Sequence, residues 1–143
     1  MRIRWVDDQL VVRMGLRSLL EVQPDMTVVA DVAGGVEAVK AFGEYHPDLT
    51  LMDLRMPDLS GSEATAAIRQ KYPAARVLVL TTFDSDEDIY RALEAGAAGY
   101  LLKNTDGEAL LETIRAVHAG TYCLPADISQ RLVQRRAAPR LSP

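Results

Sequence analysis

The stretch LMDLRMPDLSG, residues 51–61, joins an apolar run to a single carboxylate and then to a turn that ends in glycine. A short apolar run of this kind predicts a buried strand, and Pro57 and Gly61 predict a sharp turn after it. Asp58 follows the proline and is interpreted as a turn residue. Asp53 therefore stands at the end of a predicted strand, where a carboxylate either ends the strand or takes part in chemistry.

The same pattern of apolar run and turn repeats along most of the chain. Further apolar runs lie at 3–6, 27–32, 77–80 and 100–102, and helical patterns of apolar residues follow them, with one helix expected around residues 36–42. Two helix starts are predicted after Ser85 and Thr105, because each hydroxyl is followed three positions later by an acidic residue. We therefore expect five strands, each followed by a helix, in a doubly wound parallel α/β sheet with helices on both faces.

Polar side chains stand where the predicted strands end. In doubly wound sheets, ligands bind beyond the carboxyl ends of the strands, near the point where the strand order reverses. If the strand order is 2-1-3-4-5, one rim of the sheet gathers these side chains. A single one of them is better explained as a turn former, a helix cap or a solvated side chain. Together they predict a functional site formed by Asp7, Asp8, Asp53, Thr81 and Lys103.

Three carboxylates at one rim repel one another unless a cation compensates their charge. Mg²⁺ suits such a set, since it binds a few carboxylates and retains positions for phosphate oxygens. The chain has one cysteine and two histidines, without the spacing of a zinc site. Asp53 is predicted to accept a phosphoryl group, with Mg²⁺ and Lys103 compensating its charge and Thr81 donating a hydrogen bond.

Four motifs resemble the receiver domain of two-component response regulators: VDD (6–8), LMDLRMPDLSG (51–61), VLVLTTF (77–83) and AGAAGYLLK (95–103). Their wording is most similar to the NarL/FixJ subgroup, which carries a LuxR-type helix-turn-helix, and the match covers roughly residues 2–120. The resemblance implies a flavodoxin-like (βα)5 fold. It also implies a role for each matching residue: phosphoacceptor for Asp53, direct Mg²⁺ ligand for Asp8, water-mediated ligand for Asp7, ligand through the backbone carbonyl for Arg55, switch hydroxyl for Thr81, switch aromatic for Tyr100 and phosphate-pairing lysine for Lys103.

The end of the chain is interpreted by the same resemblance. Residues 1–120 are expected to form the receiver domain, and residues 121–143 a linker helix, spanning about 125–136, followed by the start of a missing DNA-binding domain at LSP (141–143). The implied partners are a sensor histidine kinase, a second copy of the chain on phosphorylation, and DNA only through the missing domain. Phosphorylation is expected to bias two states of the face between strand four and helix five.

Composition excludes several other classes of protein. With 48% apolar and 25% charged residues, the chain is typical of a globular domain. No run is long enough for a membrane span, and the N-terminal stretch MRIRWVDDQL (1–10) lacks the apolar core of a signal peptide. We expect a cytoplasmic protein without a membrane partner. The tail from residue 126 holds four arginines and one aspartate, too small a patch to bind nucleic acid by itself.

Alternative functions remain open from the sequence. One is a stand-alone receiver that acts by protein contact. Another is a Mg²⁺-dependent aspartyl-phosphate phosphatase, although such enzymes usually place a second acid where this chain has Arg55. A nucleotide-binding module would need a glycine-rich loop after the first strand, and DDQLVVRMG (7–15) has none. We expect a phosphoacceptor, and not an enzyme beyond its own phosphotransfer and dephosphorylation.

Overall fold

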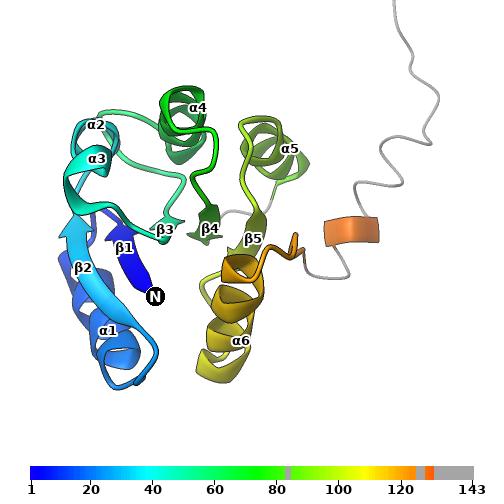
Figure 1. Cartoon of the computed structure of the whole chain (residues 1–143). Coiled ribbons are helices and arrows are strands. Elements are labelled where there is room, and N and C mark those ends of the chain that lie inside the picture. The colour runs from blue at the N-terminus through cyan, green and yellow to red at the C-terminus, as the bar shows by residue number, and fades with distance from the viewer. Residues whose placement is uncertain (83–84, 125–127, 131–143) are drawn as a thin grey trace, which may run out of the picture.

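Five parallel strands form the centre of the molecule, and helices cover both faces of the sheet (Figure 1). The computed structural model describes residues 1–82, 85–124 and 128–130. The strands are β1 (Arg2–Val6), β2 (Thr27–Val32), β3 (Leu49–Met52), β4 (Val77–Thr81) and β5 (Gly99–Leu102). The helices are α1 (Leu10–Glu21), α2 (Gly35–Lys40), α3 (Phe42–Tyr45), α4 (Gly61–Lys71), α5 (Asp86–Glu94) and α6 (Gly107–His118). The strand order β2-β1-β3-β4-β5 is the predicted one.

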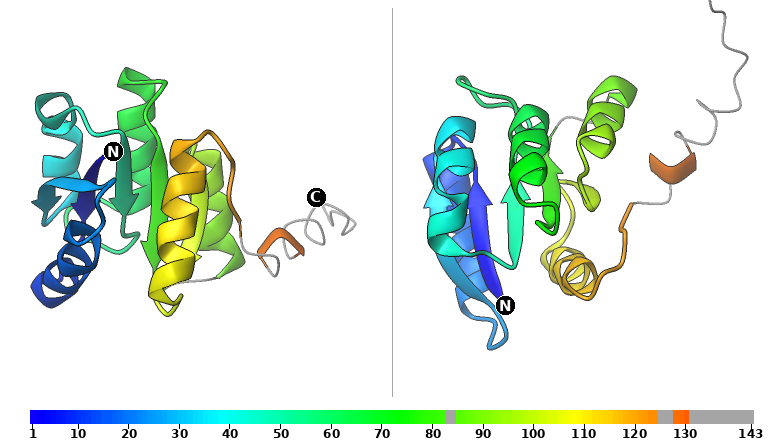
Figure 2. Two further views of the ribbon diagram at one scale, coloured as in Figure 1. Left: turned by 60° about the horizontal axis from the view of Figure 1, so that its bottom comes forward. Right: turned by 45° about the horizontal axis from the view of Figure 1, so that its top comes forward.

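The sheet separates two layers of helices, as Figures 1 and 2 show. Helices α1 and α6 cover one face, and α2, α3, α4 and α5 cover the other. Alternate residues of each strand face opposite layers. In β1, Trp5 packs with residues of α1 and α6, whereas Val6 packs with residues of α2 and α4. Burial on both faces explains why the strands read as continuous apolar runs in the sequence.

Backbone hydrogen bonds bring the carboxyl ends of the strands to one edge. The Asp7 N–H donates to Val32 at the end of β2 at 2.9 Å, and the Asp53 N–H donates to Val6 at the end of β1 at 3.0 Å. The Lys103 N–H donates to Thr81 at 2.8 Å. These bonds fix the positions, along the strand direction, of the residues that follow β1, β3 and β5. They therefore determine where the polar side chains at this edge of the sheet lie.

The second interval differs from the prediction. We expected one helix around residues 36–42, but the chain forms α2 and α3, separated at Ala41. After this break, Phe42 is buried against the ring of Tyr72, with ring centroids 4.7 Å apart. Gly43 allows this approach, since a Cβ there would lie 2.4 Å from the Tyr72 hydroxyl oxygen. The helical run is thus interrupted where Phe42 packs on Tyr72.

The helix starts agree only in part with the prediction. Ser85 caps α5 as expected, because its hydroxyl accepts the Asp88 N–H at 3.1 Å. The prediction for α6 was wrong by one residue: the side chain of Asp106, and not Thr105, accepts the N–H of the third helical residue at 2.9 Å. A carboxylate is a strong cap, and with α6 beginning at Gly107 it is the one in register.

The chain beyond α6 returns to the free edge of the sheet. Cys123 forms an isolated parallel bridge with Gly99, the Tyr100 N–H donates to the Cys123 carbonyl at 3.1 Å, and the Cys123 N–H donates to Ala98 at 3.0 Å. Further along, Ile128 is fully buried in the cluster that contains Tyr100.

Of the predicted linker helix at 125–136, the structure describes only residues 128–130, which are helical. The remainder of that helix and the LSP motif lie outside the described residues, and the boundary at residue 120 stays a prediction. None of the helices in the described part of the chain is long and apolar enough to cross a membrane.

Candidate functional site

Three carboxylates meet at the edge of the sheet where β1 and β3 end. Asp7, Asp8 and Asp53 each place an oxygen within 4.8 Å of the others. Asp7 and Asp53 are buried, with exposed fractions of 0% and 4%, whereas Asp8 is exposed. They come together because β1 and β3 are neighbours whose ends are aligned by the backbone hydrogen bonds above.

Lys103 brings a positive charge to this cluster from the end of β5. Its ammonium lies 2.7 Å from Asp7 Oδ2 and 3.6 Å from Asp53 Oδ2. The side chain is only 14% exposed, so water screens these ion pairs less than it would at the surface. One ammonium compensates only part of the charge of three carboxylates, and the cluster retains an excess of negative charge.

The surroundings of Asp53 disfavour its ionised form. Burial is the largest influence and raises the pKa of Asp53, and the charge of Asp7 raises it further. Lys103, the Leu54 N–H at 3.0 Å and a hydrogen bond from the Thr81 side chain oppose this rise in pKa. Thr81 is fully buried at the end of β4. A divalent cation at the cluster would favour the ionised form, since it adds positive charge close to the carboxylate.

One residue of the turn after β1 and one of α1 hold Asp7 in place. The Gln9 N–H donates to Asp7 Oδ1 at 2.9 Å, and Arg13 Nη1 in α1 donates to the Asp7 backbone carbonyl at 2.6 Å. Asp7 Oδ1 thus accepts a backbone donor while Oδ2 contacts Lys103. Sequence reasoning missed Gln9 and Arg13, because neither belongs to a pattern that predicts contact with a strand end.

A glycine at position 61 allows the loop after β3 to return to the backbone of Asp53 and Leu54. The Gly61 N–H donates to the Leu54 carbonyl at 2.8 Å. A Cβ at Gly61 would lie 2.1 Å from the carbonyl oxygen of Asp53, closer than any real contact of such atoms. This close approach is the physical reason for glycine at the end of the LMDLRMPDLSG stretch.

Asp58 has the turn role expected from its place after Pro57. Its carboxylate accepts the N–H groups of Gly35 and Val36 at the start of α2, at 3.1 and 3.2 Å, and that of Leu59 at 2.9 Å. Hydrogen bonds from these groups, with that of Val36 making the largest contribution, hold the pKa of Asp58 below its ordinary value. Asp58 therefore joins the loop after β3 to α2.

A complete capping box begins α4, the helix that follows this loop. Ser60 accepts the Glu63 N–H at 3.1 Å, and the Glu63 side chain accepts the Ser60 N–H at 3.4 Å. Sequence reasoning missed this cap, although the Ser-x-x-Glu spacing at 60–63 was the signal that identifies it.

Two other predicted site residues lie outside the carboxylate cluster. The side chain of Arg55 forms an ion pair with Asp88 of α5, with an N–O distance of 3.0 Å. The role predicted for Arg55 concerns its backbone carbonyl and stays a prediction. Tyr100 is fully buried beside Ile89 and Ile128, so its ring already occupies the interior next to α5.

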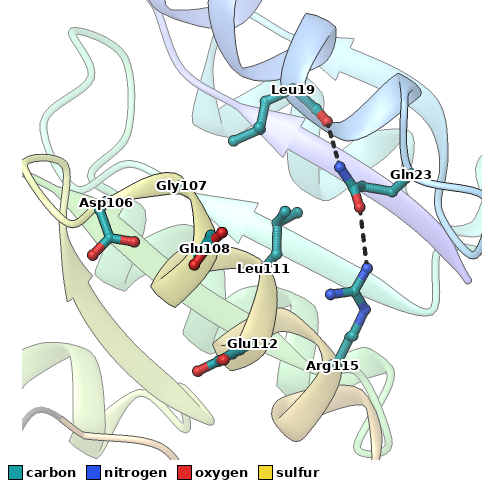
Figure 3. Close-up of a pocket in the computed structure, with 8 residues that line it drawn as sticks. All are labelled: Leu19, Gln23, Asp106, Gly107, Glu108, Leu111, Glu112 and Arg115. Atoms are coloured by element: carbon teal, nitrogen blue, oxygen red, sulfur yellow. Dashed lines mark hydrogen bonds between the residues drawn. The ribbon is translucent and has the colours of Figure 1, made fainter.

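Two hollows flank the carboxylate cluster. One is lined by Asp8 together with Gly34 and Pro57, and the other by Thr82 and Lys103. A further hollow lies between α1 and α6 and shares none of these residues (Figure 3). There, Arg115 of α6 donates to Gln23 at 3.2 Å, a contact that joins α6 to the segment after α1.

The donor set fits a hard cation. All of its atoms are carboxylate oxygens, which Mg²⁺ and similar ions prefer, and soft ligands take no part in it. The exposure of Asp8 provides access from solvent. The arrangement can therefore hold a divalent cation beside the buried carboxylate of Asp53.

Comparison with known proteins finds similarity along most of the chain. The profile of the family described as "Response regulator receiver domain" matches residues 3–115. The oxygen regulatory protein NreC of Staphylococcus aureus is 44% identical over 134 residues, which cover 93% of this chain and 62% of NreC. The transcriptional regulatory protein LnrK of Bacillus subtilis is 40% identical over 127 residues, which cover 89% of this chain and 58% of LnrK. The chain thus spans about three fifths of the length of these relatives.

Solved structures agree with this similarity. A two-component response regulator of the LuxR family from Aurantimonas sp. SI85-9A1 has a TM-score of 0.88 and 40% identity, and the match covers 96% of this chain and 98% of that one. The signal receiver domain of the NarL response regulator from Mycobacterium tuberculosis has a TM-score of 0.79 and 30% identity, over 83% of this chain and 96% of that one.

Proposed function

Because this chain belongs to the response regulator receiver family, we propose that it is switched when Asp53 accepts a phosphoryl group from a sensor histidine kinase. A receiver domain is a phosphoacceptor rather than a catalytic enzyme. The proposal for Asp53 rests above all on one observation: its buried carboxylate lies within 4.8 Å of two others and 3.6 Å from the Lys103 ammonium.

The cation at this site is proposed to be Mg²⁺. Asp7, Asp8, Asp53 and the backbone carbonyl of Arg55 would hold it. When bound, Mg²⁺ supplies positive charge for the phosphoryl oxygens and for the crowded carboxylates. The donor set supports this choice, since it consists of hard oxygen ligands that leave room for phosphate and water.

The chemical step is a transfer of phosphorus between two nucleophiles. A carboxylate oxygen of Asp53 forms a bond to phosphorus, while the bond between phosphorus and the imidazole nitrogen of the kinase breaks. The electron pair of that bond stays on the imidazole, and Asp53 becomes an acyl phosphate. Asp53 must be ionised to attack phosphorus. Positive charge close to its carboxylate therefore favours the rate of phosphoryl transfer as well as the binding of the phosphoryl group.

Lys103 and Thr81 are proposed to change partners in this step. The Lys103 ammonium moves from Asp7 to a phosphoryl oxygen, and the Thr81 hydroxyl donates to another. The bonds they leave are those to Asp7, at 2.7 Å, and to Asp53. Tyr100 transmits the change to the face formed by β4, α5, β5 and α6, and this face is proposed to control homodimerisation.

The function of the longer protein is proposed from its relatives. NreC and LnrK are named as regulatory proteins, and both are longer than this chain. We propose that residues 1–120 are the receiver domain of a transcriptional regulator, and that residues 121–143 are its linker and the start of a DNA-binding domain. Reading the gene beyond codon 143 tests this proposal, because a helix-turn-helix sequence should appear within the next roughly 60 codons.

Intact-mass measurement tests the assignment of Asp53. Native protein is incubated with acetyl phosphate and Mg²⁺, alongside Asp53→Asn and a matched control, Asp58→Asn, which removes a carboxylate from the same loop. The native protein and the control should each gain one phosphoryl group, and Asp53→Asn none. An adduct on Asp53→Asn, or no adduct on the native protein, would contradict the assignment.

A further inference from the structure

We propose that Trp5 is a positioning residue for Lys103: the face of its indole holds the ammonium at the rim while the ammonium exchanges Asp7 for a phosphoryl oxygen. The Lys103 ammonium lies 5.9 Å from the centroid of the Trp5 ring. Cations within about 6 Å of an aromatic face are attracted by its electrons, most strongly for tryptophan. The exchange itself rests on the proposed function, whereas the contact between ammonium and indole does not.

Trp5 is fixed in place by its surroundings. It lies in β1, opposite Leu51 of β3, and only 1% of its surface is exposed. Its neighbours in the core include Leu20 of α1 and Leu110 of α6. Because close-packed neighbours on these elements surround the ring, it cannot follow the lysine when the lysine moves. The indole is therefore a rigid aromatic surface next to the flexible side chain of Lys103.

The indole N–H shows that apolar packing alone does not explain this residue. Trp5 Nε1 is buried and has no hydrogen-bond partner among residues 1–82, 85–124 and 128–130. A buried donor without a partner costs stability, and an aliphatic residue in the same strand would avoid that cost. What an aliphatic side chain would lack is an electron-rich face for the ammonium.

The contacts of Lys103 differ in what phosphorylation does to them. Its two carboxylate partners, Asp7 and Asp53, are both residues that the proposed cation and phosphoryl group engage. Trp5 is engaged by neither, so it remains as a contact when both carboxylates change partners. The attraction of the indole face holds the ammonium, 14% exposed, at the rim during the exchange.

The first test uses the fluorescence of Trp5, the single tryptophan of the chain, without cation or phosphoryl donor. Lys103→Met removes the charge but keeps an unbranched side chain, and it should change the intensity and wavelength of the emission. The matched control is Lys40→Met, at an exposed position at the end of α2. Unchanged emission in Lys103→Met would overturn the proposal, and this result does not depend on whether Asp53 accepts phosphate.

The second test compares Trp5→Phe with Trp5→Met. The two replacements are of similar volume, so they should lose similar stability to urea, but only phenylalanine retains an aromatic face. The rate of phosphorylation by acetyl phosphate should be roughly 2- to 30-fold lower in Trp5→Met than in Trp5→Phe, the range that a cation–aromatic contact supports. Equal rates in two folded variants would mean that Trp5 only packs in the core and does not position Lys103, and would overturn the proposal. If neither variant folds, the Lys103→Met measurement decides the proposal.

Discussion

Replacing Gly61 with alanine should destabilise the protein and displace the backbone of Asp53. The new Cβ would lie 2.1 Å from the Asp53 carbonyl oxygen and 2.9 Å from Leu54 Cα. Contacts of Cβ atoms essentially never fall below 3.0 Å, so the gap must open by about 0.9 Å. The obstacle is backbone, which cannot rotate away as a side chain does.

The size of the effect follows from two opposing contributions. Overpacking in a close-packed region costs about 1–3 kcal/mol, and a rigid neighbour places this site in the upper half of that range. Alanine in place of glycine also restricts the unfolded chain, and this effect stabilises the folded protein by about 0.4–1 kcal/mol. The net loss in the free energy of unfolding should therefore be about 1–2.5 kcal/mol.

Urea unfolding of a matched pair of variants measures this loss. Gly15→Ala in α1 is the control, because nothing lies within 4 Å of a Cβ at that position. It should gain about 0.4–1 kcal/mol from the unfolded-state effect alone. If Gly61→Ala proved as stable as Gly15→Ala, the close approach at Asp53 would not constrain the loop, and the reasoning would be refuted.

Three further predictions concern the charges of the site. Burial raises the pKa of Asp53, so ionisation of this carboxyl destabilises the folded protein. The destabilisation is absent below pH about 4, where the carboxyl is protonated in both the folded and the unfolded state, and it is complete once the pH has risen through the folded pKa. Asp53→Asn should therefore unfold at a higher temperature than native protein at pH 7 without cation, and by a smaller margin at pH 4. Mg²⁺ should stabilise the native protein by about 1.4 kcal/mol at ten times its dissociation constant, and thermal shift should show this gain reduced in Asp7→Asn. Hydrogen bonds from α2 hold the pKa of Asp58 low, so its contribution is present at pH 7 and lost on acidification; Asp58→Ala should be less stable than native at pH 7, and a constant difference down to pH 2 would contradict this role.

Much of the fold was predictable because its signals are local. The run at residues 49–52 forms a strand with the predicted ends, and the predicted strand order brought Asp7, Asp8 and Asp53 together. Asp7 and Asp53 each stand directly after an apolar run, with Asp8 one residue further on, and parallel strands place such positions on one edge. No packing detail was needed for this part of the site.

The remainder depends on contacts between distant residues. Arg4 lies within an apolar run, yet it is fully buried, with one nitrogen 2.5 Å from the Ala38 carbonyl and its guanidinium 5.0 Å from the centre of the Phe42 ring. Burial lowers the pKa of Arg4 to about 10. The pairing of Lys103 with Asp7 is equally non-local, since it depends on the path of a long side chain over Trp5.

The segment around Cys123 has a consequence for how the protein behaves in solution. An outermost strand with free backbone groups invites pairing with another chain and so promotes aggregation. By bonding to Ala98 and Tyr100, Cys123 shields part of that border of the sheet. A truncation after residue 120 would remove the backbone hydrogen bonds of Cys123 from the edge of β5, and it would also remove Ile128 from the cluster that contains Tyr100. Recombinant versions that extend through residue 130 should therefore stay monodisperse at concentrations where the shorter ones associate.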